Sequence, residues 1–275
     1  MPKPNLKNRP NLVIIGAMKC GTSSLHYYLN LHPQIQMSSI KELDFFIEEK
    51  NWYRGLDWYE KQFIPNNQEV KIYGEASPNY TKYPTFKGVP KKMYQIIPDA
   101  KLIYIIRDPI KRIISHYIHN YAIRDINETL EATLSQLEDN HYVNCSCYGM
   151  QIDHFLQYYS SSQILILTLE ELASEPISAL KKIFNFLEVD SSFCHEEFTN
   201  VIHKSESKKR STKFGYAIGK LPAGLRFKKI IPQLMEKEIE EPVMSNQTQY
   251  KLKKILSQDL EKLKKVMAHP PFNWE

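Results

Sequence analysis

The chain has 275 residues, of which 42% are hydrophobic and 24% charged, so a disordered or fibrous protein is excluded. A length near 250 residues is common for an α/β fold with one domain, and we expect a single domain over residues 1–275. The formal net charge of +5 is too small for a typical nucleic-acid-binding surface and suits one basic pocket for an anionic ligand.

The cysteines and the N-terminal sequence bear on location. The four cysteines, Cys20, Cys145, Cys147 and Cys194, are too few and too scattered for a disulfide framework, which predicts free thiols in a reducing compartment. Residues 1–10 are polar and proline-rich, which predicts a flexible N-terminus. The apolar run that follows is too short for a signal peptide or a membrane span. We therefore expect a cytoplasmic protein without a membrane anchor.

Strands and helices alternate along the chain. Leu12–Gly16 is a continuous apolar run that ends in glycine, which is typical of a strand buried on both faces, and a helical pattern over 22–31 follows it. A short strand at 71–74 precedes the clearest strand, Lys101–Ile106, after which Asp108 is placed to cap a helix that begins at Pro109. The remaining predicted elements are a helix at 149–159, a strand at 163–168, a helix at 175–187, a basic surface loop at 203–224 and a C-terminal helix at 246–268. This order predicts an α/β fold with a P-loop-type central parallel sheet flanked by helices on both faces.

The turn after the first strand is the most informative segment. Gly16 and Gly21 have the spacing of the P-loop frame Gly-x4-Gly-Lys-Ser/Thr, and the helix after them offers backbone N–H groups and a positive dipole end to an anion. However, Thr22 stands where the P-loop lysine belongs, and the basic residue is Lys19, inside the turn. A nucleoside triphosphatase would need that lysine and an acidic magnesium partner at a strand end. The alternative is an ordinary strand-to-helix turn with a stray lysine.

A second anion-binding candidate follows the strand at 101–106. Arg107 lies at the carboxyl end of this strand, where ligands bind in open α/β sheets, and its guanidinium can bind a phosphate with two parallel hydrogen bonds. Ser115, about two helical turns further, can offer a hydroxyl to the same group. Taken singly, Arg107 could pair with Asp108 and Ser115 could be an ordinary helix serine. Together with the glycine turn, they predict two phosphate sites on two strand ends.

These motifs resemble the sulfotransferases that use 3′-phosphoadenosine 5′-phosphosulfate (PAPS), in particular the bacterial members and the heparan-sulfate N- and O-sulfotransferase branch. The resemblance runs from Leu12 to Trp274. It is strongest in Gly-Ala-Met-Lys-Cys-Gly-Thr-Ser-Ser (16–24), Lys-Glu-Leu-Asp-Phe-Phe (41–46), Gly-Leu-Asp-Trp-Tyr (55–59), Gly-Glu-Ala-Ser-Pro-Asn-Tyr (74–80) and Ile-Arg-Asp-Pro (106–109) with Ser115.

The resemblance implies PAPS as donor, its product 3′-phosphoadenosine 5′-phosphate (PAP), and no metal. It assigns the 5′-phosphosulfate to Lys19, Cys20, Gly21, Thr22, Ser23 and Ser24, and the 3′-phosphate to Arg107 and Ser115. Lys208, Lys209 and Arg210 resemble a Ser-Lys-Gly-Arg segment that closes over the 3′-phosphate, although Lys209 replaces its glycine; a solvated charge run is the alternative there. Tyr148 matches a tyrosine near the nucleotide.

The same resemblance places the catalytic base at Glu42, while Lys19 would neutralise the leaving oxygen during in-line displacement. If residues 41–46 are extended, 42, 44 and 46 share one face, so Asp44 would also point into the cleft. Asp44, Phe45 and Glu75 are the candidate acceptor-binding residues. The alternative is a pair of surface carboxylates beside two core phenylalanines.

The acceptor is expected to be a small molecule or carbohydrate that presents a hydroxyl, in preference to an amine. Ala76 stands where the heparan-sulfate branch has a lysine, which favours a neutral acceptor over a polyanionic sugar. Three rival functions are a P-loop nucleotide kinase or phosphotransferase, a non-catalytic nucleotide-binding protein, and nucleic-acid binding through the basic segment 203–213. No nucleic-acid partner is expected.

Overall fold

The computed structural model describes residues 9–64, 68–123, 126–199, 209–211, 236–240, 242–267 and 274, and for 209–211 and 236–238 it describes the backbone alone. The predicted flexible N-terminus therefore lies outside the described residues up to residue 8. Arg9 and Pro10 differ from the prediction. Pro10 is buried, and Arg9 donates from its Nε to Glu60 at 2.8 Å and from its Nη1 to the carbonyl of Ile96 at 3.1 Å.

The centre of the fold is a parallel sheet in the order β2-β3-β1-β4-β5. Its strands are β1 (Leu12–Gly16), β2 (Ile35–Met37), β3 (Ile72–Ala76), β4 (Lys101–Ile106) and β5 (Ile164–Thr168). All five residues of β1 are buried, as its unbroken apolar sequence predicts for a central parallel strand. The predicted α/β class with a P-loop-type parallel sheet is confirmed.

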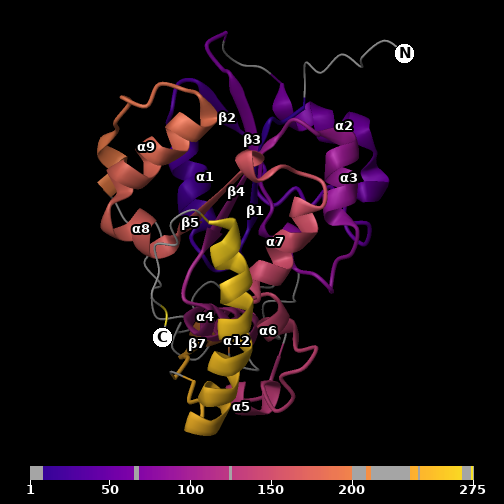
Figure 1. Cartoon of the computed structure of the whole chain (residues 1–275), viewed down its shortest axis with the longest axis vertical. Helices are drawn as coiled ribbons and strands as arrows, with labels where there is room; N and C mark the ends of the chain where they lie inside the picture. Colours follow the sequence, from indigo (N-terminus) through magenta and orange to yellow (C-terminus); the bar gives the residue numbers. More distant parts are fainter. Residues whose placement is uncertain are drawn as a thin grey trace, which may run out of the picture.

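Helices cover both faces of the sheet (Figure 1). On one side lie α1 (Thr22–Asn30), α8 (Leu169–Ser174) and α9 (Pro176–Leu187), and on the other α2 (Leu56–Glu60), α3 (Val89–Ile96) and α7 (Tyr148–Leu156). Their buried side chains join the sheet in one large apolar cluster. This packing leaves the carboxyl edge of the sheet as the place where loops and helix ends gather.

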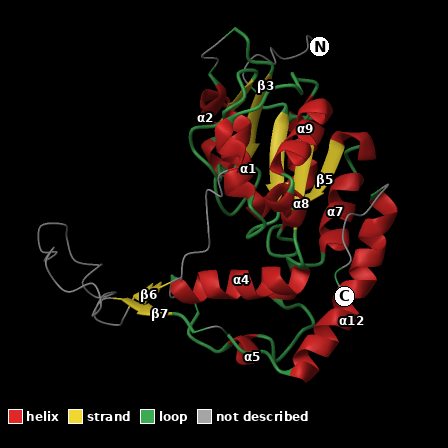
Figure 2. Ribbon diagram, turned by 90° about the vertical axis from the view of Figure 1, so that its left-hand side faces the viewer, coloured by secondary structure: helices red, strands yellow, loops and turns green. Residues whose placement is uncertain are grey.

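Below that edge lie α4 (Pro109–Ala122), α5 (Leu130–Thr133), α6 (His141–Asn144) and the long α12 (Asn246–Val266) (Figure 2). They share a second apolar cluster, formed by Ile113, Tyr117, Leu130, Leu134, Tyr142, Val143, Cys147, Leu252 and Leu256. Asp259 of α12 ties this part to the sheet layer, because its carboxylate accepts from the backbone N–H groups of Gly149 and Met150 at the start of α7, both at 2.7 Å. As predicted, Asp108 caps α4 by accepting from the Lys111 N–H at 2.9 Å.

Three strands of the sheet end at residues that the sequence singles out. After β1 the chain enters the glycine turn and α1; after β3 it enters a 3₁₀ turn, Pro78–Thr81; after β4 it passes Arg107 and enters α4. Because β1 is hydrogen-bonded to both β3 and β4, these three exits lie side by side. Most of the predicted loop 203–224 lies outside the described residues. Its residues Lys209–Ser211 form β6, which pairs antiparallel with β7 (Glu236–Glu238) and contacts α4 (Figure 2).

Candidate functional site

A cavity of about 550 Å³ opens at the carboxyl edge of the sheet. It collects predicted residues from three separate segments and a long helix: Lys19, Gly21, Thr22, Ser23, Ser24, Glu42, Arg107 and Ser115. The structure therefore brings these predicted residues together around one cavity. Cys20, Asp44, Phe45, Glu75 and Tyr148 do not line it.

The glycine turn is shaped by close packing beneath it. A side chain at Gly16 would meet the Thr81 hydroxyl oxygen at 2.0 Å, so only glycine lets β1 pass under the 3₁₀ turn. Gly21 has φ 85°, in the left-handed region that glycine tolerates, and it begins α1. Lys19 is also left-handed, with φ 73°, at a cost that an ordinary turn would avoid. The turn directs the first-turn N–H groups of α1, which have no acceptor within the helix, to the cavity where Thr22, Ser23 and Ser24 lie.

Arg107 lies directly against this turn. Its Nη1 donates to the Lys19 carbonyl at 3.3 Å, and its Nε is buried and has no hydrogen-bond partner among the described residues. A buried guanidinium N–H without an acceptor is costly, and an anion in the cavity would satisfy it. Asp108, the alternative partner, instead caps α4. The two predicted anion-binding groups therefore face one cavity, and Ser115 of α4 lines the same space.

The segment that carries Glu42 is not extended, so the predicted shared face of residues 42, 44 and 46 is wrong. Glu42 has φ 62° and Asp44 φ 48°, both left-handed, and the side chains diverge. Glu42 lines the cavity with its side chain 47% exposed and pairs with Lys41, whose Nζ lies 2.7 Å from Glu42 Oε1. Its backbone N–H donates to the Ala76 carbonyl at 2.9 Å, which fastens the segment to the end of β3.

Asp44, Phe45 and Glu75 do not reach the cavity, so their predicted contact with the acceptor is not what the structure shows. Asp44 is buried, and its Oδ2 accepts from Lys50 and from Asn79, the latter at 2.7 Å. Phe45 is a core residue that stacks on Tyr59 with ring centroids 4.3 Å apart. Glu75 is fully buried beneath the sheet edge. An extended conformation of residues 41–46 would direct Asp44 into the cleft. The left-handed turn buries Asp44 instead.

Cys20 and Tyr148 lie under the turn rather than in the cavity. The Cys20 thiol is fully buried 3.8 Å from the Tyr148 hydroxyl, burial raises its pKa to about 11, and its backbone N–H already donates to the Ala17 carbonyl at 3.1 Å. Tyr148 is also fully buried, and its hydroxyl donates to the Arg107 carbonyl at 2.9 Å. Both predicted nucleotide contacts are therefore corrected: these side chains support the turn and Arg107 from below.

The predicted closing segment is described only in part. Lys208 lies outside the described residues, and so do the side chains of Lys209 and Arg210. The backbone of the latter two belongs to β6, which contacts the helix that carries Ser115.

Two residues near the site were missed by sequence reasoning. His119 lines the cavity one helical turn after Ser115, and the four-residue spacing on a predicted helix could have found it. Lys82 follows the 3₁₀ turn and is only 8% exposed; within the described part of the chain its ammonium has no ion-pair or hydrogen-bond partner. Burial, with a further contribution from Arg112 and Lys50, lowers the pKa of Lys82. No sequence signal marks it.

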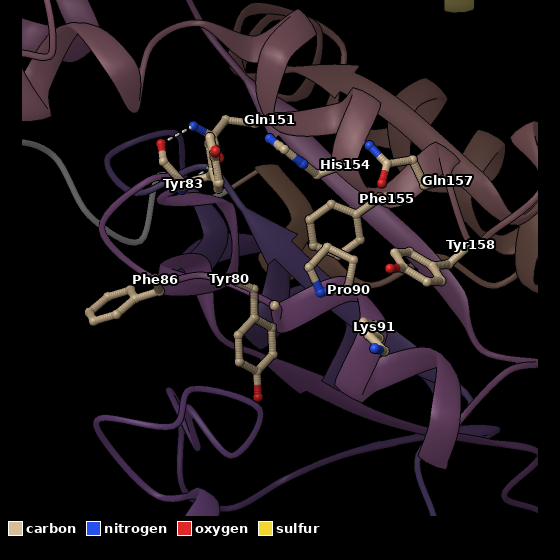
Figure 3. Close-up of a pocket in the computed structure, with 11 residues that line it drawn as sticks. Tyr80, Tyr83, Phe86, Pro90, Lys91, Gln151, His154, Phe155, Gln157 and Tyr158 are labelled. Atoms are coloured by element: carbon tan, nitrogen blue, oxygen red, sulfur yellow. Dashed lines mark hydrogen bonds between the residues drawn. The ribbon is translucent and has the colours of Figure 1, made fainter.

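A smaller cavity of about 180 Å³ lies between α3 and α7, on another side of the 3₁₀ turn (Figure 3). Aromatic rings dominate its wall, and the Gln151 amide there is fully engaged, since it accepts from the Tyr83 N–H at 2.9 Å and donates to the Tyr83 carbonyl at 2.7 Å. Tyr80 contributes its ring, while its hydroxyl points away from the cavity. This space therefore lacks the convergent cationic groups of the larger one.

The described residues contain neither a metal-binding cluster nor a membrane-spanning helix. No group of three or more His, Cys, Asp or Glu side chains is arranged there to hold a metal ion. In the same part of the chain, every helix is too short or too polar to cross a bilayer.

Comparison with known proteins agrees with this geometry. The family model for the sulfotransferase domain matches residues 9–229. The bifunctional heparan sulfate N-deacetylase/N-sulfotransferase of Drosophila melanogaster is 29% identical over 211 residues, which cover 67% of this chain and 20% of that protein. The human bifunctional heparan sulfate N-deacetylase/N-sulfotransferase 2 is 29% identical over 196 residues, which cover 65% and 22%. The chain thus spans about a fifth of the length of these curated relatives.

Solved structures share the fold. A sulfotransferase from Alicyclobacillus acidocaldarius superposes with a TM-score of 0.71 at 24% identity, over 95% of this chain and 97% of that one. Mouse sulfotransferase SULT7A1, solved in complex with PAP, gives a TM-score of 0.50 at 18% identity, over 94% and 86%. Because the family model extends over most of its length, the chain belongs to the sulfotransferase family.

Proposed function

We propose that the chain transfers a sulfuryl group from PAPS to an acceptor hydroxyl. The observation that carries the proposal is the shared cavity: the glycine turn with Lys19 and the guanidinium of Arg107 face the same space from neighbouring strand ends. Two anion-binding groups that line one cavity suit an adenosine that is phosphorylated at both its 5′ and 3′ positions. Thr22 stands in place of the P-loop lysine, and Arg107 rather than a carboxylate directly follows β4; both argue against the kinase alternative.

Different residues of the cavity bind the two phosphorylated ends of the donor. Lys19 and the first-turn N–H and hydroxyl groups of α1 hold the 5′-phosphosulfate, and Lys19 stabilises the charge that develops on the leaving phosphate oxygen. Arg107 and Ser115 hold the 3′-phosphate, and the buried Arg107 Nε gains an acceptor when they do. Lys208, Lys209 and Arg210 close over this end, a role supported by the contact of β6 with α4. PAPS supplies an activated sulfuryl group and requires no metal for transfer.

Glu42 acts as the general base that takes the proton of the acceptor hydroxyl. Its carboxylate lines the cavity and remains half exposed, so an acceptor can reach it. The exposed ion pair with Lys41 is worth at most about 1 kcal/mol and therefore does not block this role. A positioned base of this kind contributes about 10²- to 10⁴-fold in rate.

The acceptor is a small molecule or a sugar that offers a hydroxyl. The curated relatives are named for N-sulfation of heparan sulfate, but Ala76 leaves the end of β3 without the lysine of that branch. We further propose a cytoplasmic location, because Cys20, Cys145 and Cys147 are free and buried, as expected in a reducing compartment.

Titration of the purified protein with PAP, ADP and ATP, each with and without magnesium, tests the proposal. We expect PAP to bind at least about 100-fold more tightly than ADP, from two charge-assisted hydrogen bonds to the 3′-phosphate of about 1.5 kcal/mol each. Magnesium should have no effect on PAP binding. Equal affinities for PAP and ADP, or ATP binding that depends on magnesium, would refute it.

A further inference from the structure

Glu75 is an ionisable group placed inside the core, next to the site but outside the cavity. It is 0% exposed, at the carboxyl end of β3. Its carboxylate accepts three hydroxyl hydrogen bonds, from Tyr59 at 2.5 Å, from Ser77 at 2.6 Å and from Tyr80 at 3.1 Å. Burial raises its pKa to about 7. A buried carboxyl group without a cationic partner is costly, so we expect Glu75 to have a structural or functional role at this position.

The hydroxyl of Ser77 connects this carboxylate to the loop above it. Ser77 is itself fully buried, and its Oγ accepts the backbone N–H of Asp44 at 3.0 Å. A hydroxyl has one proton to donate. Because that proton goes to Glu75, an oxygen lone pair of Ser77 is directed at Asp44. The carboxylate thus fixes the direction in which Ser77 accepts.

The loop that Ser77 holds needs such support. Glu42 and Asp44 both occupy the left-handed region, which costs an L-residue roughly 1–2 kcal/mol each. Two hydrogen bonds to the end of β3 fasten this turn: Glu42 N–H to the Ala76 carbonyl at 2.9 Å, and Asp44 N–H to Ser77. If the second is lost, the turn is free to relax toward a more favourable φ, and the Glu42 side chain moves with it.

We propose that Glu75 is a positioning residue which, through the Ser77 hydroxyl, holds the turn at residues 42–44 and so places the Glu42 carboxylate at the cavity. The role of Glu42 as base rests on the proposed function; the link from Glu75 through Ser77 to Asp44 does not. Glu75 touches neither donor nor acceptor, and its effect reaches the site only through the backbone of this turn.

A double-mutant cycle with Glu75→Gln, Ser77→Ala and the combined variant tests the link. The readout is the NMR resonance and hydrogen-exchange protection of the Asp44 amide in the free protein. We expect each single variant to lower this protection at least tenfold, and the combined variant to lower it no further than Ser77→Ala alone. Amides of β1 and β4 should keep their protection. Tyr159→Phe, which removes a buried hydroxyl bonded to the Ile97 carbonyl at 3.1 Å, is the matched control and should leave Asp44 unchanged.

Two further measurements connect the link to the chemistry. The affinity for PAP should stay within twofold in all variants, because the donor groups lie on other segments. The release of PAP from PAPS, with water as acceptor and sulfate as the second product, should slow at least tenfold in kcat with KM for PAPS nearly unchanged. A wild-type protein that fails to bind PAP would refute the proposed function. The double-mutant cycle on the Asp44 amide would still test the link from Glu75 through Ser77.

The inference is overturned if Ser77→Ala leaves the Asp44 amide protected, or if the effects of the two single variants add. Additive effects would mean that Glu75 and Ser77 support the core independently. Should Glu75→Gln fail to fold, Ser77→Ala still tests the bond from Ser77 to the Asp44 amide, and retained protection of that amide overturns the inference.

Discussion

The buried carboxyl of Glu75 should make the protein less stable as the pH rises, and Glu75→Gln is the substitution that reveals it. Between its ordinary pKa of 4.5 and its folded pKa of about 7, the folded chain binds more protons than the unfolded chain at this group. The free energy of unfolding therefore falls as pH rises through this range, and the contribution is fully lost only above about 7. Integrated between pH 5 and pH 8, the loss from this one group is roughly 2–3 kcal/mol.

The assay is urea unfolding of the wild type and Glu75→Gln at pH 5, 6, 7 and 8, followed by tryptophan fluorescence. Trp52 and Trp58 contact Phe45, close to the Glu75 cluster, so the signal reports on this region. The difference between the two proteins removes the contributions of all other titrating groups. We expect the wild type to lose roughly 2–3 kcal/mol relative to Glu75→Gln from pH 5 to pH 8. A constant difference would refute the reasoning, and one of the opposite sign would show that the three hydroxyl bonds outweigh burial.

Three other substitutions have defined outcomes. Arg107→Met should weaken PAP binding about 100-fold in calorimetry and leave ADP binding within twofold, since only the 3′-phosphate loses its partner; parallel losses for both ligands would contradict this. Glu42→Gln should slow PAP release from PAPS about 10²- to 10⁴-fold while PAP affinity is kept, and unchanged turnover would exclude Glu42 as base. Lys82→Met should raise the free energy of unfolding by about 1–2 kcal/mol in urea, because an apolar side chain of similar length replaces a largely buried lysine that has no ion-pair partner among the described residues; a lower stability would show that the ammonium is satisfied in the folded protein.

The central strands β1 and β4 could be predicted because their sequences are almost entirely apolar. Leu12–Gly16 and Lys101–Ile106 match β1 and β4 residue for residue. The missed strand, Ile35–Met37, has only three residues, too few for any periodicity to mark them. Its place at the edge of the sheet comes from pairing with β3, a contact between distant parts of the chain that the local sequence does not encode.

The sequence indicated which segments form the site. It did not indicate which side chains of those segments point into the cavity. Lys19 and Arg107 reach the cavity because each lies within three residues of the carboxyl end of a strand. A residue at that place in the sequence lies at the carboxyl edge of the sheet whatever the direction of its side chain. Asp44 does not, because a left-handed turn without glycine is held by Ser77, 33 residues away in sequence. Cys20 and Tyr148 belong to the right segments, yet their side chains turn into the core under the same loop.

Several costly features of this protein lie around one cavity, and their location is an argument about function. Lys19 and Glu42 are left-handed without being glycine, and the Arg107 Nε is buried without an acceptor; such features cost about 1–3 kcal/mol each. The sheet and the helices beneath them share a large apolar core, and hydrophobic burial there does not by itself require this arrangement. An anion that enters the cavity satisfies Arg107 and the α1 amides only in the folded chain, and so stabilises that chain by mass action. The strain at the carboxyl edge is therefore best explained as preorganisation for a ligand with two separated negative groups.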